Sequence, residues 1–500
     1  MNPPRPPFQL SGPSVPRRRH ARSPVIWVGA IAAVVAPVVI SVTAPHEQLA
    51  GALVAYLNLL VFGVAAAYFI SSGTLQGLIP VIFLTWLEAA WPLASIYFAT
   101  QCPEYAYVTT VDERQFLFRN LWVQTVTLAF VLAYLGTTFA FRGRATAWSM
   151  PLSSASSARR VPGVVLVLVI GAITLHAVSK VVTLPDVIQY FADGGYLYLH
   201  GLMFMVGALF LRLRVHTRSW ALLFMGLAAS FYVLGNARGQ AGLPVALFLA
   251  GIVLLSDLKY HWKAWIVTVA CVSFPLALVI ANTTRQMTGT IGFGDLASRL
   301  RALGQWHEVV STTPVLASTF GRLFFIGGHT IVTMSPEQFP FVDFAPLTYV
   351  WEFLTRLLPR RLMFDSYYSA NPNVILMRYD FLVTEETSVP VSLIGSLYML
   401  GGLTPVMLGG MAIAMFHCLV ARCLGRLARY SPYLGLFVFA MIATNLLWAQ
   451  NLDPITHVRG VVWAGVAAIV LYQLVLRPFL AEPVRMRRRR RIPRLVPRPV

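Results

Sequence analysis

The stretch SWALLFMGLAASFYVLGNARGQAGLPVALFLAGIVLL, residues 219–255, decides the fold class because it holds two long apolar runs around a short polar segment. A bilayer core about 30 Å thick needs roughly 20 apolar residues for each helical crossing, and both runs approach that length. Arg238 lies between the runs, and the stretch contains no acidic residue. The pattern predicts two membrane helices whose short connection holds an unpaired cation near the membrane interface.

The composition extends this prediction to the whole chain. The 500 residues are 57% hydrophobic and 12% charged, with a mean hydropathy of +0.67. A soluble globular protein of this composition would have too little polar surface to face water. Apolar runs of membrane length recur about twelve times. The sequence therefore predicts an all-α, polytopic integral membrane protein with spans near 25–44, 48–70, 77–100, 116–141, 162–184, 196–212, 219–236, 240–256, 264–283, 396–421, 432–450 and 458–478.

Basic residues predict the orientation. Most of the 39 Lys and Arg fall in the segments that are cytoplasmic if the N-terminus is cytoplasmic, as the positive-inside rule requires. Both termini are then cytoplasmic, and the run at 25–44 is expected to stay as an anchor rather than to be cleaved. The expected order is a basic arm 1–24, transmembrane helices one to nine in 25–283, a large extracytoplasmic loop 284–395, helices ten to twelve in 396–478, and a basic tail 479–500.

The net charge of +20 follows mainly from this topology and from adhesion to anionic lipid headgroups. No folded nucleic-acid module accompanies the basic tail, so membrane lipid is expected as a partner and nucleic acid is not. The large loop nevertheless carries more arginines than its external position favours. Its segments 296–310 and 349–362 have apolar residues at helical spacing and are expected to lie along the membrane surface.

Three kinds of partner could explain those arginines: substrate phosphates, matched acids of the same loop, or external lipid headgroups. Acids of the same loop could neutralise part of the charge in surface pairs worth at most about 1 kcal/mol each. The remainder could bind phosphate groups. Arg238 is the strongest candidate because an interfacial charge beside apolar spans is costly and usually faces a polar cavity on a functional path.

The chain resembles the oligosaccharide repeat-unit polymerases of bacterial O-antigen and exopolysaccharide (Wzy type), and more distantly the O-antigen ligases. The similarity rests on the number of spans, on NARGQAG at 236–242, on one long external loop late in the chain, and on SVPVSLIGSLYMLGGLTPVMLGG at 388–410. In that last segment small residues, a tyrosine and a glycine pair lead into the next span, as in the family.

The resemblance implies a glycosyltransferase of the GT-C type in the bacterial inner membrane, with its active site on the extracytoplasmic side. Such an enzyme takes a growing glycan from its undecaprenyl diphosphate carrier and transfers it to another lipid-linked repeat unit. A chain-length-regulating co-polymerase is implied as a possible partner. The ligase reading shares the donor but transfers the glycan to a different acceptor, which the sequence does not identify.

The chemistry favours a metal-independent enzyme. Breaking a sugar–diphosphate bond expels a polyanion, whose charge must be stabilised by a metal ion or by fixed cations. The sequence contains no Asp-x-Asp and no Cys/His spacing typical of zinc sites, so we expect neither metal nor other cofactor. Guanidinium groups bind phosphate oxygens bidentately and keep their charge. The leading diphosphate contacts are Arg238, Arg285 and Arg322, followed by Arg360, Arg361 and Arg378.

A general base is expected to accept the proton of the acceptor hydroxyl. His329 follows a glycine pair in GRLFFIGGHTIV, residues 321–332, and histidine titrates near neutral pH. A histidine that is merely hydrogen-bonded within an apolar helix would give the same pattern. The sequence does not choose among His329 and the carboxylates, of which Glu352 and Glu386 are the main candidates and Asp365 and Glu385 the others.

Glu88, in FLTWLEAAWPL at 83–93, keeps a transporter or flippase in view. A lone carboxyl inside a predicted span is protonated, paired across helices, or part of a proton or substrate path. Lys180 or Arg119 could pair with it. Against a transporter stand the absence of a visible sequence repeat and the concentration of polar residues in one loop. A purely structural role is the third alternative.

Overall fold

The computed structural model describes about half of the chain, almost all of it helical. The described residues are 35–44, 46–71, 75–85, 91–101, 113–142, 161–179, 199–213, 215–235, 243–256, 258–259, 261–270, 392–447 and 454–480, with positions 182, 185, 273 and 304.

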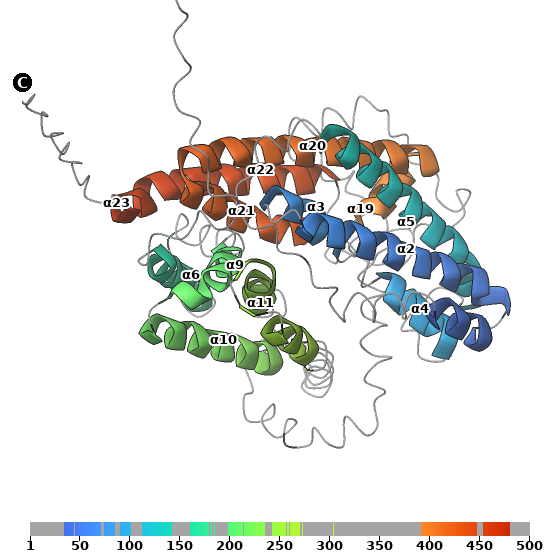
Figure 1. Ribbon diagram of the computed structural model, residues 1–500, viewed down its shortest axis with the longest axis horizontal. Helices are drawn as coiled ribbons and strands as arrows, with labels where there is room; N and C mark the ends of the chain where they lie inside the picture. The colour runs from blue at the N-terminus through green and yellow to red at the C-terminus, as the bar shows by residue number, and fades with distance from the viewer. Residues whose placement is uncertain are drawn as a thin grey trace, which may run out of the picture.

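These residues form helices and no strand within the described ranges (Figure 1). Besides helical residues at 35–43 and 261–270, the elements are α2 (His46–Ser71), α3 (Leu75–Thr85), α4 (Trp91–Gln101), α5 (Glu113–Arg142), α6 (Val161–Ser179), α9 (Leu202–Ala208), the 3-10 turn η6 (Phe210–Arg212), α10 (Val215–Gly235), α11 (Leu243–Leu255), α19 (Leu393–Met399), α20 (Leu403–Tyr430), α21 (Pro432–Leu447), α22 (Pro454–Leu471), the π-helical η11 (Tyr472–Leu476) and α23 (Arg477–Leu480).

The described helices have the length and surface of membrane helices. Four segments are long and apolar enough to cross a bilayer: Gln48–Ile70, Leu121–Phe141, Leu403–Tyr430 and Pro454–Leu476. Large apolar side chains face outward along them, which water would disfavour and lipid accepts. The chain is therefore an α-helical, membrane-embedded protein, as the composition predicted.

One hydrophobic cluster forms around α5, at the right of Figure 1. Helices α2 and α20 pack along α5, and α3, α4 and α19 complete the cluster. Its largest buried side chains include Phe83, Phe130 and Tyr134. The outer face of α2 stays apolar and exposed, as expected of a helix that faces lipid.

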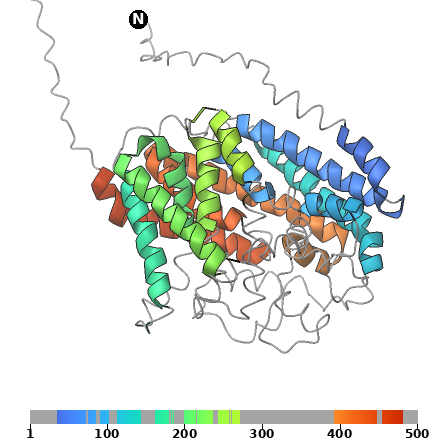
Figure 2. The ribbon, with the colours of Figure 1, turned by 90° about the horizontal axis from the view of Figure 1, so that it is seen from below.

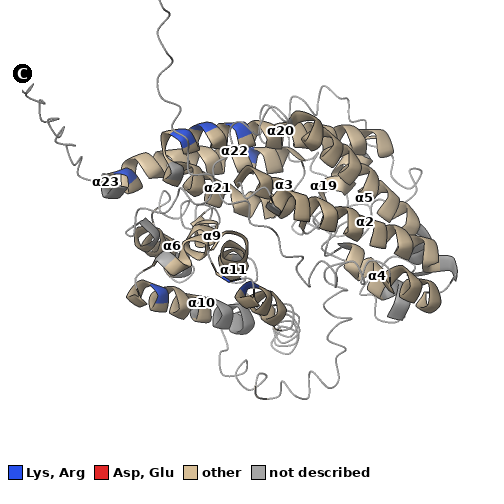
Figure 3. Ribbon diagram, in the orientation of Figure 1, with Lys and Arg blue, Asp and Glu red and all other residues tan. Residues whose placement is uncertain are grey.

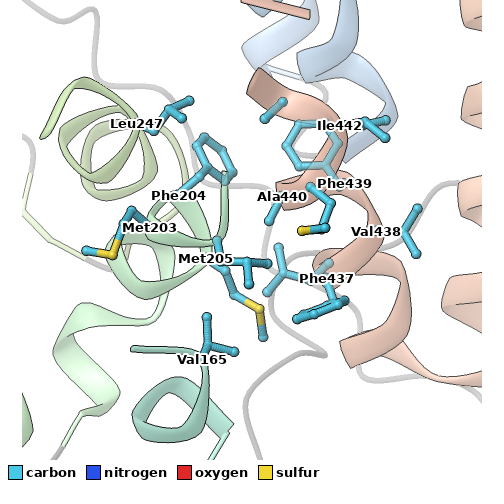
Figure 4. Packing of buried hydrophobic residues seen from close by; sticks show 14 of the residues in the cluster. Val165, Met203, Phe204, Met205, Leu247, Phe437, Val438, Phe439, Ala440 and Ile442 are labelled. Atoms are coloured by element: carbon cyan, nitrogen blue, oxygen red, sulfur yellow. The ribbon is translucent and has the colours of Figure 1, made fainter. Parts of the chain in front are cut away.

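A second cluster joins α9 and α11 to α21 and α22, and Figure 2 shows this group from a perpendicular direction. Phe204 of α9 contacts Phe439 of α21, with ring centroids 5.4 Å apart, in the interface that Figure 4 shows from close by. Helix α20 connects the two clusters: Val406 and Ile413 of its first half pack in the first, and Leu424 of its second half packs in the second.

Two predicted spans prove to be pairs of helices. The segment expected as one span over 77–100 holds the separate helices α3 and α4. Pro92 is the second residue of α4, where its missing N–H and fixed φ favour a helix start and disfavour continuation from the preceding turn.

The span expected over 396–421 is also interrupted. Helix α19 ends at Met399 and α20 begins at Leu403, and Gly401 and Gly402 between them have φ values of 141° and 80°. Positive φ suits glycine and ends a right-handed helix. Within the run expected at 196–212, the helix α9 covers only Leu202–Ala208 before η6, which is too short to cross a bilayer of about 30 Å by itself.

A buried amide pair between α2 and α5 supports one stability prediction. The Asn58 Nδ2 atom donates to the Gln124 Oε1 atom at 3.0 Å and to the Gln124 backbone carbonyl at 3.1 Å. We expect Asn58→Leu to lower the free energy of unfolding in detergent by about 1–3 kcal/mol, because it leaves the buried Gln124 amide unpaired. The double change Asn58→Leu with Gln124→Leu should recover most of that loss, and a double variant as unstable as the single one would contradict this account.

Candidate functional site

The residues that the sequence singled out lie outside the described part of the chain. This holds for the candidate bases His329, Glu352 and Glu386, for the diphosphate candidates Arg238, Arg285, Arg322, Arg360, Arg361 and Arg378, and for Glu88 and Lys180. Arg119 lies in α5. Helix α10 ends at Gly235 and α11 begins at Leu243, so Arg238 belongs to the connection between two apolar helices.

Within the described residues, a different polar site occupies the interior of the bundle. It joins Tyr134 of α5, His417 of α20 and His457 of α22, whose side chains are 0%, 3% and 0% exposed. The Tyr134 hydroxyl lies 2.8 Å from the Nδ1 atom of His417. The Nε2 atoms of His417 and His457 are 3.0 Å apart. Three ionisable groups from three helices thus form one continuous hydrogen-bonded chain, which we call the Tyr–His–His chain.

Small residues bring these helices close together. A Cβ on Gly410 of α20 would lie 2.9 Å from the backbone carbonyl of Phe130, one turn before Tyr134 on α5. On α22, Gly460 lies against the Asn445 side chain of α21, one turn after His457. Small residues at helix contacts let backbones approach in membranes, and positions three or four apart share a helix face. The approach of α20 to α5 at Gly410 thus lies one to two turns from the Tyr134–His417 contact, and the approach of α22 to α21 at Gly460 lies one turn from His457.

Two hydrogen-bond arrangements fit the Tyr–His–His chain when both rings are neutral. In the first, the Tyr134 O–H donates to Nδ1 of His417, and Nε2–H of His417 donates to Nε2 of His457. In the second, Nε2–H of His457 donates to Nε2 of His417, and Nδ1–H of His417 donates to the Tyr134 oxygen. A neutral imidazole has one donor and one acceptor nitrogen, so each arrangement fixes both tautomers.

Aromatic rings enclose the Tyr–His–His chain. The Phe83 ring of α3 meets His417 edge-on at 4.7 Å between centroids, and lies 5.5 Å from His457 and 5.0 Å from Tyr134. An apolar surrounding of this kind strengthens the hydrogen bonds within it. No group of three or more His, Cys, Asp or Glu suited to a metal ion occurs in the described part of the chain.

The basic residues of the described helices lie toward the helix ends (Figure 3). Arg422, Arg426 and Arg429 occupy the last third of α20, and Arg477 begins α23. These ends meet, since the Ser431 hydroxyl lies 2.6 Å from the Tyr472 hydroxyl. The described acids are Glu47 and Glu113, each at the first turn of its helix. No described residue near the Tyr–His–His chain is thus a carboxylate.

Sequence reasoning did not find this site. His417, in MFHCLV, and His457, in ITHVRG, lie in or beside apolar runs, and the rule that directed attention to Glu88 applies to them equally. Their pairing could not be foreseen, because it depends on how α20 and α22 cross. Comparison with protein-family models, with curated proteins and with solved structures finds no match to this chain.

Proposed function

We propose that this chain is a metal-independent glycosyltransferase that polymerises undecaprenyl-diphosphate-linked oligosaccharide repeat units on the extracytoplasmic face of the bacterial inner membrane. Its proposed architecture is a GT-C-like bundle of about twelve spans, with both termini cytoplasmic and the loop 284–395 over the active site. A chain-length-regulating co-polymerase is the proposed protein partner.

The observation that carries the proposal is the position of Arg238 between α10 and α11. Neither helix contains an acidic residue, and the connection 236–242 contains none. A guanidinium group held beside two apolar helices is costly unless an anion or a polar cavity receives it. A lipid-linked diphosphate supplies such an anion at the membrane surface, so its charge suits this cation.

The proposed reaction needs one base and several fixed cations. The acceptor hydroxyl attacks the anomeric carbon of the glycan, the bond from that carbon to the diphosphate oxygen breaks, and the lipid diphosphate leaves. His329, Glu352 or Glu386 accepts the hydroxyl proton. Arg238, Arg285 and Arg322, with Arg360, Arg361 and Arg378, stabilise the charge of the departing diphosphate in place of a divalent cation.

The conformation of 392–403 supports the proposal further. The small residues and the tyrosine of this segment form α19, and the glycine pair separates α19 from α20. Tyr398 is buried, and its hydroxyl accepts a hydrogen bond of 3.1 Å from Nε1 of Trp122 on α5. The described part of the segment that resembles the polymerase family thus forms a fixed bend at the start of a long helix. Such a bend suits a polypeptide that re-enters the bundle from an external loop.

One observation favours a second candidate, a proton-coupled transporter of lipid-linked oligosaccharide. Proton-coupled transporters use ionisable residues within the bundle, and the Tyr–His–His chain lies there. We rank it second because it assigns no role to cations in an external loop. An O-antigen ligase is the variant of the first proposal with another acceptor.

Depletion of the chain in its own cells separates these functions. The polymerase proposal predicts that long glycans vanish while single repeat units accumulate on the lipid carrier in the outer leaflet, as measured by lipid extraction and leaflet-selective labelling. A transporter predicts accumulation in the inner leaflet, and a ligase predicts accumulation of long lipid-linked chains. Re-expression of the wild-type chain serves as the control, and glycans of unchanged length after depletion would contradict all three functions.

A further inference from the structure

Beside the Tyr–His–His chain, helix α21 also holds buried polar atoms. The Nδ1 atom of His457, the Nδ2 atom of Asn445 and the Oγ1 atom of Thr444 are buried, and none has a hydrogen-bond partner among the described residues. The Asn445 backbone approaches the His457 ring, but no hydrogen bond to Nδ1 forms between them. The Asn445 side chain lies against Gly460 of α22, one turn after His457, whereas the Thr444 hydroxyl lies toward Gly201, just before α9.

This group distinguishes the site from a simple polar contact between helices. A buried donor or acceptor without a partner destabilises the fold, and a contact that served stability alone would gain from apolar side chains there. The interior nevertheless keeps an ionisable ring whose outer nitrogen is buried without a partner among the described residues. At the opposite end, the Tyr134 hydroxyl can both accept a proton and release its own.

The groups around the Tyr–His–His chain leave its two histidines free to change tautomer. The rings that face the two histidines are Phe83 of α3, Phe416 of α20 and Tyr134 of α5. The nearest cations along the sequence are Arg422 on α20 and Arg459 on α22, each within two turns of its histidine. No carboxylate with a described side chain is present to hold one imidazole permanently in one tautomer.

We propose that Tyr134, His417 and His457 form a proton relay inside the membrane bundle, with its ends at the Nδ1 atom of His457 and at the Tyr134 hydroxyl. This is a function additional to glycan polymerisation. The Tyr–His–His chain carries a proton between α22 and α5 by switching between its two hydrogen-bond arrangements, and it retains no charge.

The proton transfer starts from the second arrangement, in which the Nε2–H group of His457 donates to His417. Hydronium gives a proton to Nδ1 of His457, and the Nε2–H bond of His457 breaks as the Nε2–H bond of His417 forms. The Nδ1–H bond of His417 then breaks as a new O–H bond forms on Tyr134, and the earlier phenol proton passes to water. One proton enters and one leaves, all three groups end neutral in the first arrangement, and the reverse sequence carries a proton in the opposite direction.

Nitrogen-15 NMR of the full-length chain with labelled histidine tests the relay. A relay predicts that Nε2 of both rings and Nδ1 of His417 give signals averaged between the protonated and the bare nitrogen positions, because the two arrangements exchange. A static contact predicts one fixed tautomer for each ring. Fixed tautomers in the wild-type protein would overturn the proposal, as would a ring-nitrogen signal that moves on addition of a metal chelator.

Tyr134→Phe is the decisive variant, since it removes the phenol oxygen and keeps the ring that packs on Phe83. It should abolish the averaging at His417 while the protein keeps its helical circular dichroism. His216→Gln is the matched control, because His216 is exposed on α10, a helix that contributes no residue to the Tyr–His–His chain. Averaging that survives Tyr134→Phe, or that His216→Gln also abolishes, would overturn the relay. The glycan assay is independent of both results.

Discussion

Gly251→Ala is expected to leave little correctly folded protein, and Gly251→Val less still. Helices α9 and α11 touch at the backbone: a Cβ on Gly251 would overlap the Phe204 carbonyl and lie 2.9 Å from the Ala208 nitrogen, and a Cβ on Gly207 would overlap the Phe248 carbonyl. Neither backbone can yield without separating the helices. Overpacking a core typically costs about 1–3 kcal/mol, and total stabilities are only about 5–15 kcal/mol.

Gly63→Ala provides the matched control for this prediction. Gly63 is an exposed residue of α2, and a Cβ there would meet nothing within 4 Å. Alanine should therefore be neutral or stabilise the helix by about 0.5–1 kcal/mol. The measurement is the yield of monodisperse protein in detergent and its thermal unfolding midpoint. A Gly251→Ala protein as stable as Gly63→Ala would show that α9 and α11 do not meet as described.

Arg238→Ala and Arg322→Ala are each expected to reduce glycan polymerisation by about 10²–10³-fold, the usual cost of removing one group that stabilises developing charge. Lysine at either position should restore little, because an ammonium cannot bind two phosphate oxygens in the planar geometry of a guanidinium. The measurement is the rate at which lipid-linked repeat units enter longer chains, with the amount of inserted protein determined alongside.

Arg477→Gln is the control for the arginine variants. Arg477 is exposed at the start of α23, and its Nη1 atom makes a hydrogen bond of 3.0 Å to Gln473 on the helix surface. Loss of this cation should leave polymerisation unchanged. Equal losses in Arg477→Gln and Arg238→Ala would indicate a general effect of positive charge on insertion, and full activity of Arg238→Ala would remove that residue from the proposed diphosphate site.

The sequence predicted best where an apolar run and a helix have the same length. The span expected at 116–141 is α5, Glu113–Arg142, and the span expected at 48–70 is α2, His46–Ser71. Hydropathy alone carries such predictions. It failed at Pro92 and at Gly401–Gly402, because a break inside an apolar run changes backbone conformation without changing hydropathy.

The polar interior was less accessible to sequence reasoning. Interfacial cations and Glu88 stand out in a sequence because they are charged. Histidine carries no permanent charge near neutral pH, so His417 and His457, which lie in or beside apolar runs, do not stand out. Their partnership connects positions 40 residues apart, and it becomes visible only when the crossing of α20 with α22 is known. Tyr134 is harder still, since a tyrosine in an apolar helix usually needs no explanation.

The most direct test of the proposed function uses the purified chain in liposomes with synthetic undecaprenyl-diphosphate-linked repeat units as the sole substrate. The account predicts a ladder of longer lipid-linked glycans, formed at the same rate with and without EDTA because arginines replace the divalent cation. The ladder should disappear with Arg238→Ala. A folded wild-type protein that makes no longer chains, or makes them only when a divalent cation is supplied, would contradict the account.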